Sequence, residues 1–174
     1  IEIEPAVAGA SRFFVKENRD VLKDPRVRLT IADGRNFILS TDKMYDIIIS
    51  EPSNPWIGGI GNLFSLEFYQ IVAGRLAPDG IICQWIQGYN LFPQDLRMVI
   101  KTLRTVFPHT TVWNTSPGDY LLIGSRAPLS LDYTSLENRY KALATLREDM
   151  ARVGLRSSLA LLADFVLGDE DTAR

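Results

Sequence analysis

Residues 45–56 read YDIIISEPSNPW, and this stretch decides the fold class of the chain. Its first six residues form a short apolar run rich in isoleucine, which is typical of a strand covered on both faces. Glu51 follows at once, and Pro52 and Pro55 end the strand pattern. A glycine-rich connection then leads to residues 63–76, which have helical spacing. A strand followed by a polar loop and a helix is the repeating unit of an α/β sheet.

Short apolar runs alternate with helical stretches in both directions from this segment. The predicted strands are Ile1–Glu4, Val27–Ala32, Tyr45–Ser50, Gly80–Trp85, Thr110–Trp113 and Tyr120–Ile123. The predicted helices between them are Pro5–Asn18, Leu63–Leu76 and Pro93–Phe107. This alternation predicts the α/β class, with a mostly parallel sheet and helices on both of its faces.

The pattern changes after Ser125. Leu131–Gly154 is rich in charged residues and helix formers, and Leu159–Leu167 is an apolar run. We predict two helices outside the sheet here, and therefore a sheet domain over residues 1–125 with a helical extension over residues 126–174. The chain has no initiator Met and its strand pattern begins at Ile1, so we expect the natural chain to start earlier.

Composition excludes several classes of protein. The 174 residues include 19 Lys and Arg against 21 Asp and Glu, with no basic block to neutralise a row of phosphates, which argues against a nucleic-acid partner. Cys83 and His109 are the single residues of their types, so no disulfide forms within the chain and no familiar zinc spacing exists. The longest uncharged stretches, Pro52–Leu66 and Gly80–Gln94, are too short to span a bilayer. We expect a soluble piece without a metal, and a lone thiol fits the cytoplasm.

Acidic residues follow three of the predicted strands, where α/β sheets bind their ligands. Glu2 and Glu4 close the first strand, Asp33 follows the second and Glu51 the third, so we expect all of them to face one crevice. The two oxygens of Glu2 match a ribose diol, and Asp33 before Gly34 can accept from the amine of adenine. The alternative is that Asp33 and Gly34 form a turn, while Glu2 or Glu4 is a charge at a helix N-terminus.

Two further segments can line a ligand site. The connection after Glu51 runs for about eleven residues, carries Trp56 and three glycines, and can close over a ligand, although an ordinary connection stays the alternative. It lacks the lysine of a phosphate-binding loop. Aromatic and amide side chains follow the fourth strand and suit a polar ligand; they are Gln84, Trp85, Gln87, Tyr89 and Asn90.

The order of these motifs resembles the polyamine synthase (spermidine and spermine synthase) family, which has a Rossmann-like methyltransferase fold. The motifs are Ile1–Glu4, Ala32–Arg35, Asp46–Pro55 and Cys83–Trp85. Bacterial spermidine-synthase-like domains fused to transporter-like membrane segments are especially similar. The resemblance covers essentially the whole chain, and it implies that the first strand of the fold, with its glycine-rich turn, precedes Ile1.

The resemblance implies a role for each candidate residue. It assigns ribose to Glu2 and adenine to Asp33 with Gly34, and it places Glu51 where the family has a catalytic aspartate. Asn54 stands where the family has a second, diamine-binding aspartate. Substrate contacts are expected from this segment and from the fourth strand: Ser53, Asn54, Gln84, Trp85 and Tyr89.

The implied reaction is aminopropyl transfer from decarboxylated S-adenosylmethionine, a co-substrate, to a small amine, with no permanently bound cofactor and no metal. One alternative is a class I methyltransferase that uses S-adenosylmethionine. Another is a non-catalytic polyamine- or nucleoside-sensing domain of a membrane transporter, which the neutral Asn54 favours. A homodimer, fused membrane segments and a cytoplasmic location complete these expectations.

Overall fold

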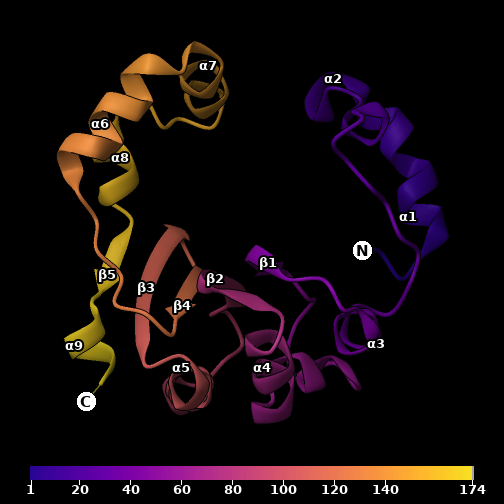
Figure 1. The fold of residues 1–174 in the computed structure, drawn as a ribbon, viewed down its shortest axis with the longest axis vertical. Coiled ribbons are helices and arrows are strands. Elements are labelled where there is room, and N and C mark those ends of the chain that lie inside the picture. Colours follow the sequence, from indigo (N-terminus) through magenta and orange to yellow (C-terminus); the bar gives the residue numbers. More distant parts are fainter. Residues whose placement is uncertain (174) are drawn as a thin grey trace. The chain divides into compact units, whose positions relative to one another are not determined.

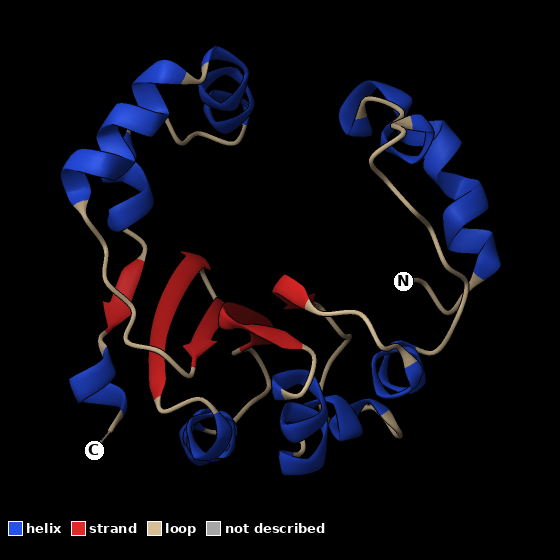
Figure 2. Ribbon diagram, in the orientation of Figure 1, coloured by secondary structure: helices blue, strands red, loops and turns tan. Residues whose placement is uncertain are grey.

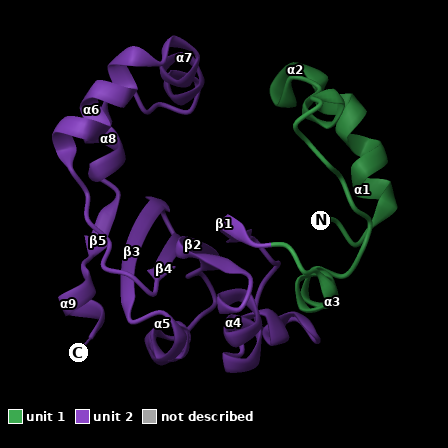
Figure 3. Ribbon diagram, in the orientation of Figure 1, with its two compact units in different colours: residues 1–43 green, residues 44–174 purple. Residues whose placement is uncertain are grey.

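The computed structural model describes residues 1–173, and the contacts within the chain form two compact units. Unit 1 comprises residues 1–43 and unit 2 residues 44–174 (Figure 3). This division differs from the predicted boundary near Ser125, which stays a prediction. Each unit is described by itself below.

Unit 1 is mostly helical. Its elements are α1 (Pro5–Ala10), the 3-10 turn η1 (Ser11–Phe14), α2 (Val15–Asn18), the 3-10 turn η2 (Val21–Lys23) and α3 (Gly34–Ser40). Pro5 occupies the first turn of α1, where its missing N–H costs nothing. The predicted helix over Pro5–Asn18 is confirmed as helical turns of two kinds.

The two strands predicted in unit 1 are wrong as regular strands. Ile1–Glu4 and Val27–Ala32 meet only at an isolated parallel bridge between Glu2 and Ile31. Glu2 N donates to the Thr30 carbonyl at 3.1 Å, and Ala32 N donates to the Glu2 carbonyl at 3.0 Å. Two hydrogen bonds hold the segments side by side but do not extend into a ladder.

Unit 2 is built on a five-stranded sheet (Figure 2). Its strands are β1 (Tyr45–Ser50), β2 (Leu76–Gln87), β3 (His109–Ser116), β4 (Asp119–Ser125) and β5 (Phe165–Leu167), in the order β1-β2-β4-β3-β5. Strand β1 has the predicted bounds, and the other three predicted strands of this unit lie inside β2, β3 and β4. The α/β class is confirmed.

The expected mostly parallel sheet is wrong, because the sheet is mixed. Only β1 and β2 pair in parallel, and the other three pairings are antiparallel. The pairing of β3 with β4 is antiparallel because their link is short and consists of Pro117 and Gly118. Gly118 adopts a φ of 86°, and such a link allows only a hairpin, since parallel strands need a long crossover.

Two helices cover one face of the sheet and form the core with it. After the 3-10 turn η3 (Ile60–Phe64), α4 (Leu66–Ala73) and α5 (Pro93–Val106) lie beneath the strands (Figure 1). The fully buried side chains include Tyr69, Val72, Leu76, Ile82, Ile86, Leu103, Phe107 and Leu122. On the opposite face, Ile47 and Ile49 are 56% and 69% exposed. Helices on both faces stay a prediction, since the helices of unit 1 are not placed against this sheet.

The C-terminal region is helical apart from β5. Its helices are α6 (Tyr133–Ala142), α7 (Ala144–Arg152), α8 (Ser158–Leu162) and α9 (Asp169–Thr172). The predicted helix over Leu159–Leu167 is wrong in its last part, because Phe165–Leu167 pairs with β3. The ring of Phe165 packs edge-on against Trp113, with centroids 5.1 Å apart, which stabilises this short edge strand. No helix in residues 1–173 has the length and apolar character needed to cross a bilayer.

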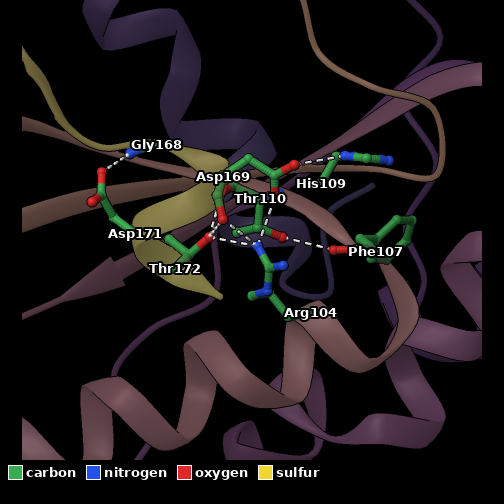
Figure 4. Close-up of polar contacts among 8 residues, drawn as sticks. All are labelled: Arg104, Phe107, His109, Thr110, Gly168, Asp169, Asp171 and Thr172. Carbon is green, nitrogen blue, oxygen red and sulfur yellow. Dashed lines mark hydrogen bonds and ion pairs between the residues drawn. The ribbon is translucent and has the colours of Figure 1, made fainter. Parts of the chain in front are cut away.

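A polar cluster fastens α9 to α5 and β3 (Figure 4). Arg104 Nη1 donates to Asp169 Oδ1 at 2.6 Å and to Thr172 Oγ1 at 2.7 Å. The other oxygen of Asp169 lies 2.7 Å from His109 Nδ1, and Thr172 Oγ1 donates to the Thr110 carbonyl at 2.8 Å. Asp169 thus links a helix and a strand that lie about sixty residues earlier in the chain.

Burial raises the pKa of Asp169, but the hydrogen bonds from His109 and Arg104 outweigh burial and hold this pKa below its ordinary value. A lowered folded-state pKa means that the carboxylate stabilises the fold above the unfolded pKa of about 3.9. This contribution is lost as the pH falls through the folded-state pKa.

We predict that Asp169→Asn lowers the free energy of unfolding at pH 7 by about 1 kcal/mol, a value discounted because the side chain is 41% exposed. The difference from wild type should shrink as the pH drops below about 3.9. Urea unfolding at pH 7 and pH 3 measures both effects. Glu170→Gln, an exposed neighbour on α9, is the charge-matched control. Equal losses in the two variants would contradict the role of Asp169.

Candidate active site

In unit 1, the parallel bridge brings two of the predicted acids to the ends of neighbouring segments. Glu2 is paired with Ile31, two residues before Asp33. Glu2 is half-buried, and its Oε1 accepts from the backbone N of Glu4 at 2.8 Å. Asp33 and Gly34 are exposed. The two segments run parallel, so Glu2, predicted to bind ribose, and Asp33, predicted to bind adenine, lie near the same end of the paired segments.

Both alternatives weighed for the acids of unit 1 are also present in the structure. Glu4 caps α1 by accepting from Ala6 N at 2.8 Å. Asp33 caps α3, with Oδ1 accepting from Asn36 N at 2.7 Å. A cap of this kind satisfies one of the free N–H groups of the first helical turn. It uses one of the two carboxylate oxygens, so capping does not by itself exclude a contact to adenine.

In unit 2, Glu51 emerges at the carboxyl end of β1. Ser50, the last residue of the strand, is buried and pairs with Gln84 of β2, whereas Glu51 is exposed. A chain leaving a parallel strand at this edge enters the usual ligand side of an α/β sheet. Glu51 is thus a carboxylate held at its base by the sheet and open to an incoming molecule.

Gln84 lies on β2 beside Ser50, the residue that precedes Glu51. Its side chain is fully buried, and its Nε2 donates to the Ser50 carbonyl at 3.3 Å and to the Trp85 carbonyl at 3.0 Å. Its Oε1 is buried and accepts no hydrogen bond from residues 1–173. A buried amide oxygen without a donor is costly, by about 1–3 kcal/mol, and is the kind of exception that functional sites hold.

The other predicted substrate residues surround the same two strand ends. Ser53 is exposed and Asn54 is half-buried, in a turn where the Asn54 carbonyl accepts from Ile57 N at 3.0 Å. Trp85 is half-buried within β2, and Tyr89 follows the strand and is half exposed. These residues line the exits of β1 and β2.

The charge of Glu51 affects the pKa of the Cys83 thiol. Cys83 pairs with Ile49, two residues before Glu51. Burial, and after it the negative charge of Glu51, raises the pKa of this thiol. The thiol is therefore protonated at neutral pH and is a poor nucleophile, although Cys83 is only half-buried.

The structure brings the predicted residues together in two groups. Glu2, Asp33 and Gly34 share unit 1, and Glu51 shares unit 2 with the predicted substrate residues. The expectation that all the acids face one crevice stays a prediction, because the two units are not placed relative to each other.

Sequence reasoning missed helix α3 and the contact between Trp56 and Tyr89. An aspartate before a helical stretch was a signal for α3, whereas nothing local signals a contact across 33 positions.

A family model described as the spermine/spermidine synthase domain matches residues 1–118. The chain belongs to this family. The match includes both groups of candidate residues, so the resemblance inferred from the motifs is confirmed. Fusion to membrane segments stays a prediction.

Individual relatives cover the chain well but extend beyond it. Putrescine N-methyltransferase 2 of Nicotiana tabacum is 29% identical over 96% of this chain and 50% of its own length. Spermidine synthase of Dictyostelium discoideum is 30% identical over 68% of this chain and 42% of its own length. A polyamine aminopropyltransferase of Clostridium perfringens is 30% identical over 71% and 46%, respectively. The chain thus spans about half the length of these relatives or less.

Solved structures confirm the fold. Spermidine synthase from Thermotoga maritima matches with a TM-score of 0.72 and 21% identity, covering 97% of this chain and 56% of that one. Human methyltransferase-like protein 13 matches with a TM-score of 0.60 and 20% identity, covering 94% and 68%, respectively. The fold is therefore that of spermidine synthases and related methyltransferases.

We predict that Glu51→Gln lowers the pKa of Cys83, because the substitution removes one of the two causes that raise it. The rate of iodoacetamide alkylation against pH measures this pKa, and the rate curve should shift to lower pH in the variant. Glu67→Gln, at an exposed position of α4, serves as the control. Coinciding curves for wild type and Glu51→Gln would show that the charge of Glu51 does not reach the thiol.

Proposed function

We propose that this chain takes part in aminopropyl transfer from decarboxylated S-adenosylmethionine to a small amine. The observation that carries the proposal is the exposed carboxylate of Glu51 at the carboxyl end of β1, in a chain of the spermine/spermidine synthase family. A spermidine synthase solved in complex with a transition-state analogue has a similar fold, with a TM-score of 0.75 and 22% identity over 97% of this chain and 57% of that one.

Glu51 acts as the general base in this proposal. The ammonium group of the acceptor loses a proton to the carboxylate, and the free amine attacks the carbon bonded to the sulfonium sulfur. A carbon–nitrogen bond forms, the carbon–sulfur bond breaks, and 5′-methylthioadenosine leaves with the electron pair on sulfur. An exposed carboxylate on a rigid strand end can receive that proton and release it to water.

Gln84 and its neighbours bind the acceptor amine. The free Oε1 of Gln84 can accept a hydrogen bond from an amine N–H, which would satisfy the one atom of its carboxamide without a partner in residues 1–173. Ser53, Asn54, Trp85 and Tyr89 supply the remaining contacts at the exits of β1 and β2. Glu2 and Asp33 with Gly34 bind the nucleoside through its ribose and adenine.

A second candidate is methyl transfer from S-adenosylmethionine to an amine. The similarity to putrescine N-methyltransferase over 96% of the chain favours it. The two reactions share the acceptor chemistry and differ in whether the donor keeps its carboxylate. Calorimetric affinities for the two donors separate them, because a negative site disfavours the donor that carries an extra carboxylate.

The remaining expectations follow from the same proposal. The substrates are small molecules, the donor is consumed as a co-substrate, and no permanently bound cofactor is required. A reduced lone cysteine supports a cytoplasmic location. We also propose, from the family resemblance, that the protein forms a homodimer and that the full-length chain has fused membrane segments.

We predict that Glu51→Gln lowers amine-dependent turnover of the full-length protein by about a hundredfold or more, the usual contribution of general base catalysis. Affinity for 5′-methylthioadenosine should not change, because the carboxamide keeps the shape of the site. Steady-state rates with a panel of mono-, di- and triamines measure the first effect, and calorimetry the second. Turnover in Glu51→Gln equal to that of the Glu67→Gln control would remove Glu51 from the mechanism.

We predict that Asp33→Ala weakens binding of 5′-methylthioadenosine by about 1–3 kcal/mol, the cost of an unpaired polar group. Asp33→Ser separates this role from helix capping, because serine caps a helix as well as aspartate but lacks the second carboxylate oxygen. The serine variant should keep the thermal stability of wild type and lose nucleoside affinity. Wild-type affinity in Asp33→Ser would mean that Asp33 serves α3 alone.

A further inference from the structure

Trp56 and Tyr89 meet across the exits of the two parallel strands. Their ring centroids are 6.2 Å apart, and the ring planes lie at 71°. Trp56 comes from the connection that begins at Glu51, and Tyr89 from the segment that follows β2. The two residues are 45% and 50% exposed, so each remains accessible to solvent despite the contact.

Tyr89 is the anchored member of this pair. Gly88 N donates to the Gly118 carbonyl at 2.6 Å, which ties the exit of β2 to the β3–β4 hairpin. A Cβ at Gly88 would lie 2.5 Å from the ring of Tyr120, so the backbone is packed directly on that ring. Asn90 follows with a φ of 57°, which completes a tight turn. Tyr89 is thus held against the sheet.

Trp56 lies on the more adaptable side. Gly58 and Gly59 follow it within three residues, and added Cβ atoms there would meet nothing within 4 Å. Gly59 has a φ of 86°, a conformation that other residues rarely adopt. The contact therefore joins a ring on an open glycine loop to a ring fixed on the sheet.

The connection that carries Trp56 holds few charges. From residue 51 to residue 66, Glu51 is the single ionisable side chain, and Asn54 is neutral. An aromatic face carries negative electrostatic potential and attracts an ammonium group within about 6 Å of the ring centroid. Two half-exposed rings at the strand exits, one of them on the connection that begins at Glu51, suit a cation with an apolar stem.

We propose that Trp56 and Tyr89 form the wall of the acceptor subsite, hold the alkylammonium group of the amine against their ring faces, and so determine acceptor specificity. This inference rests on the proposed transfer to an amine. Glu51 removes the proton, whereas the aromatic wall supplies affinity for the charge and for the methylene stem. No proton or bond is exchanged with either ring.

The test compares amine binding by variants of the full-length protein that keep an aromatic ring face with binding by variants that keep only apolar surface. Trp56→Leu and Tyr89→Leu keep apolar area but remove the ring face, whereas Trp56→Phe keeps a face. Phe165→Leu is the matched control, because Phe165 is 46% exposed and also packs edge-on against a tryptophan. Calorimetry with 1,4-diaminobutane and with neutral 1,4-butanediol measures binding without turnover. Circular dichroism checks that each variant folds.

Each leucine variant should weaken diamine binding by about fivefold to thirtyfold, the range expected for a cation–π contact that the bound amine shields from water, and should leave diol binding within twofold. Trp56→Phe should recover most of the affinity, and Phe165→Leu should match wild type. In kinetics, KM for the amine should rise while kcat stays within about twofold.

Unchanged diamine affinity in folded leucine variants, or equal losses for diamine and diol, would overturn the aromatic wall. The transfer proposal would still stand if the wild type turned over an amine. Conversely, a wild type that binds the diamine through these rings but transfers nothing to any amine from either donor would overturn the proposed function and support the wall.

Discussion

The hydrogen bond from the buried carboxamide of Gln84 to the carbonyl of Ser50 determines where strand β1 ends and where Glu51 begins. Burying an amide is unfavourable unless its groups are paired, so the pairing of these two residues resists slippage. A shift by one residue would bury Glu51 and expose Ser50. The carboxylate is therefore positioned by the register of the parallel pair.

The antiparallel half of the sheet makes that pair rigid. Strand β2 pairs with β4 along Ile81–Gln87, and the residues that face α4 and α5 are buried. Gly124 shows how tight this packing is, because an added Cβ would lie 3.0 Å from both Ile82 and Phe107. At the far edge, Asp169 and Arg104 hold the segment that covers β3. The connections after β1 and β2 therefore start from a tightly packed sheet.

The sequence predicted the parts of this fold whose signals are local. Tyr45–Ser50 was placed with its observed bounds because a continuous isoleucine run after a polar stretch has one good interpretation. The hairpin was missed, although the two-residue link at Pro117 and Gly118 excludes a parallel crossover. Strand β5 could not be predicted, because its three residues carry no period of their own. Their backbone pairing with β3 and the contact of Phe165 with Trp113 depend on the folded sheet.

The candidate site shows the same division. The sequence predicts the position of Glu51 at the end of β1, because an acid directly after a buried strand has a known position in an α/β sheet. Asp33 was ambiguous from sequence and stays so in structure, since one carboxylate can cap a helix with Oδ1 and still offer Oδ2 to a ligand. The contact of Trp56 with Tyr89 depends on the folded sheet, which is why no pattern around either residue could show it.

In the proposed acceptor site, the neutral Asn54 changes how a cationic amine would be selected. Two carboxylates would favour a dication, and at an exposed site each contact at about 4 Å contributes roughly 1 kcal/mol in water and weakens with salt. A ring face contributes about 0.5–1 kcal/mol at an exposed site and about 2 kcal/mol once the bound amine excludes water from it, and it also buries the stem next to the charge. In the proposed acceptor subsite, one carboxylate and two rings would therefore bind one ammonium and its neighbouring methylenes. Its selectivity then depends less on the number of charges on the amine and more on the length of its stem.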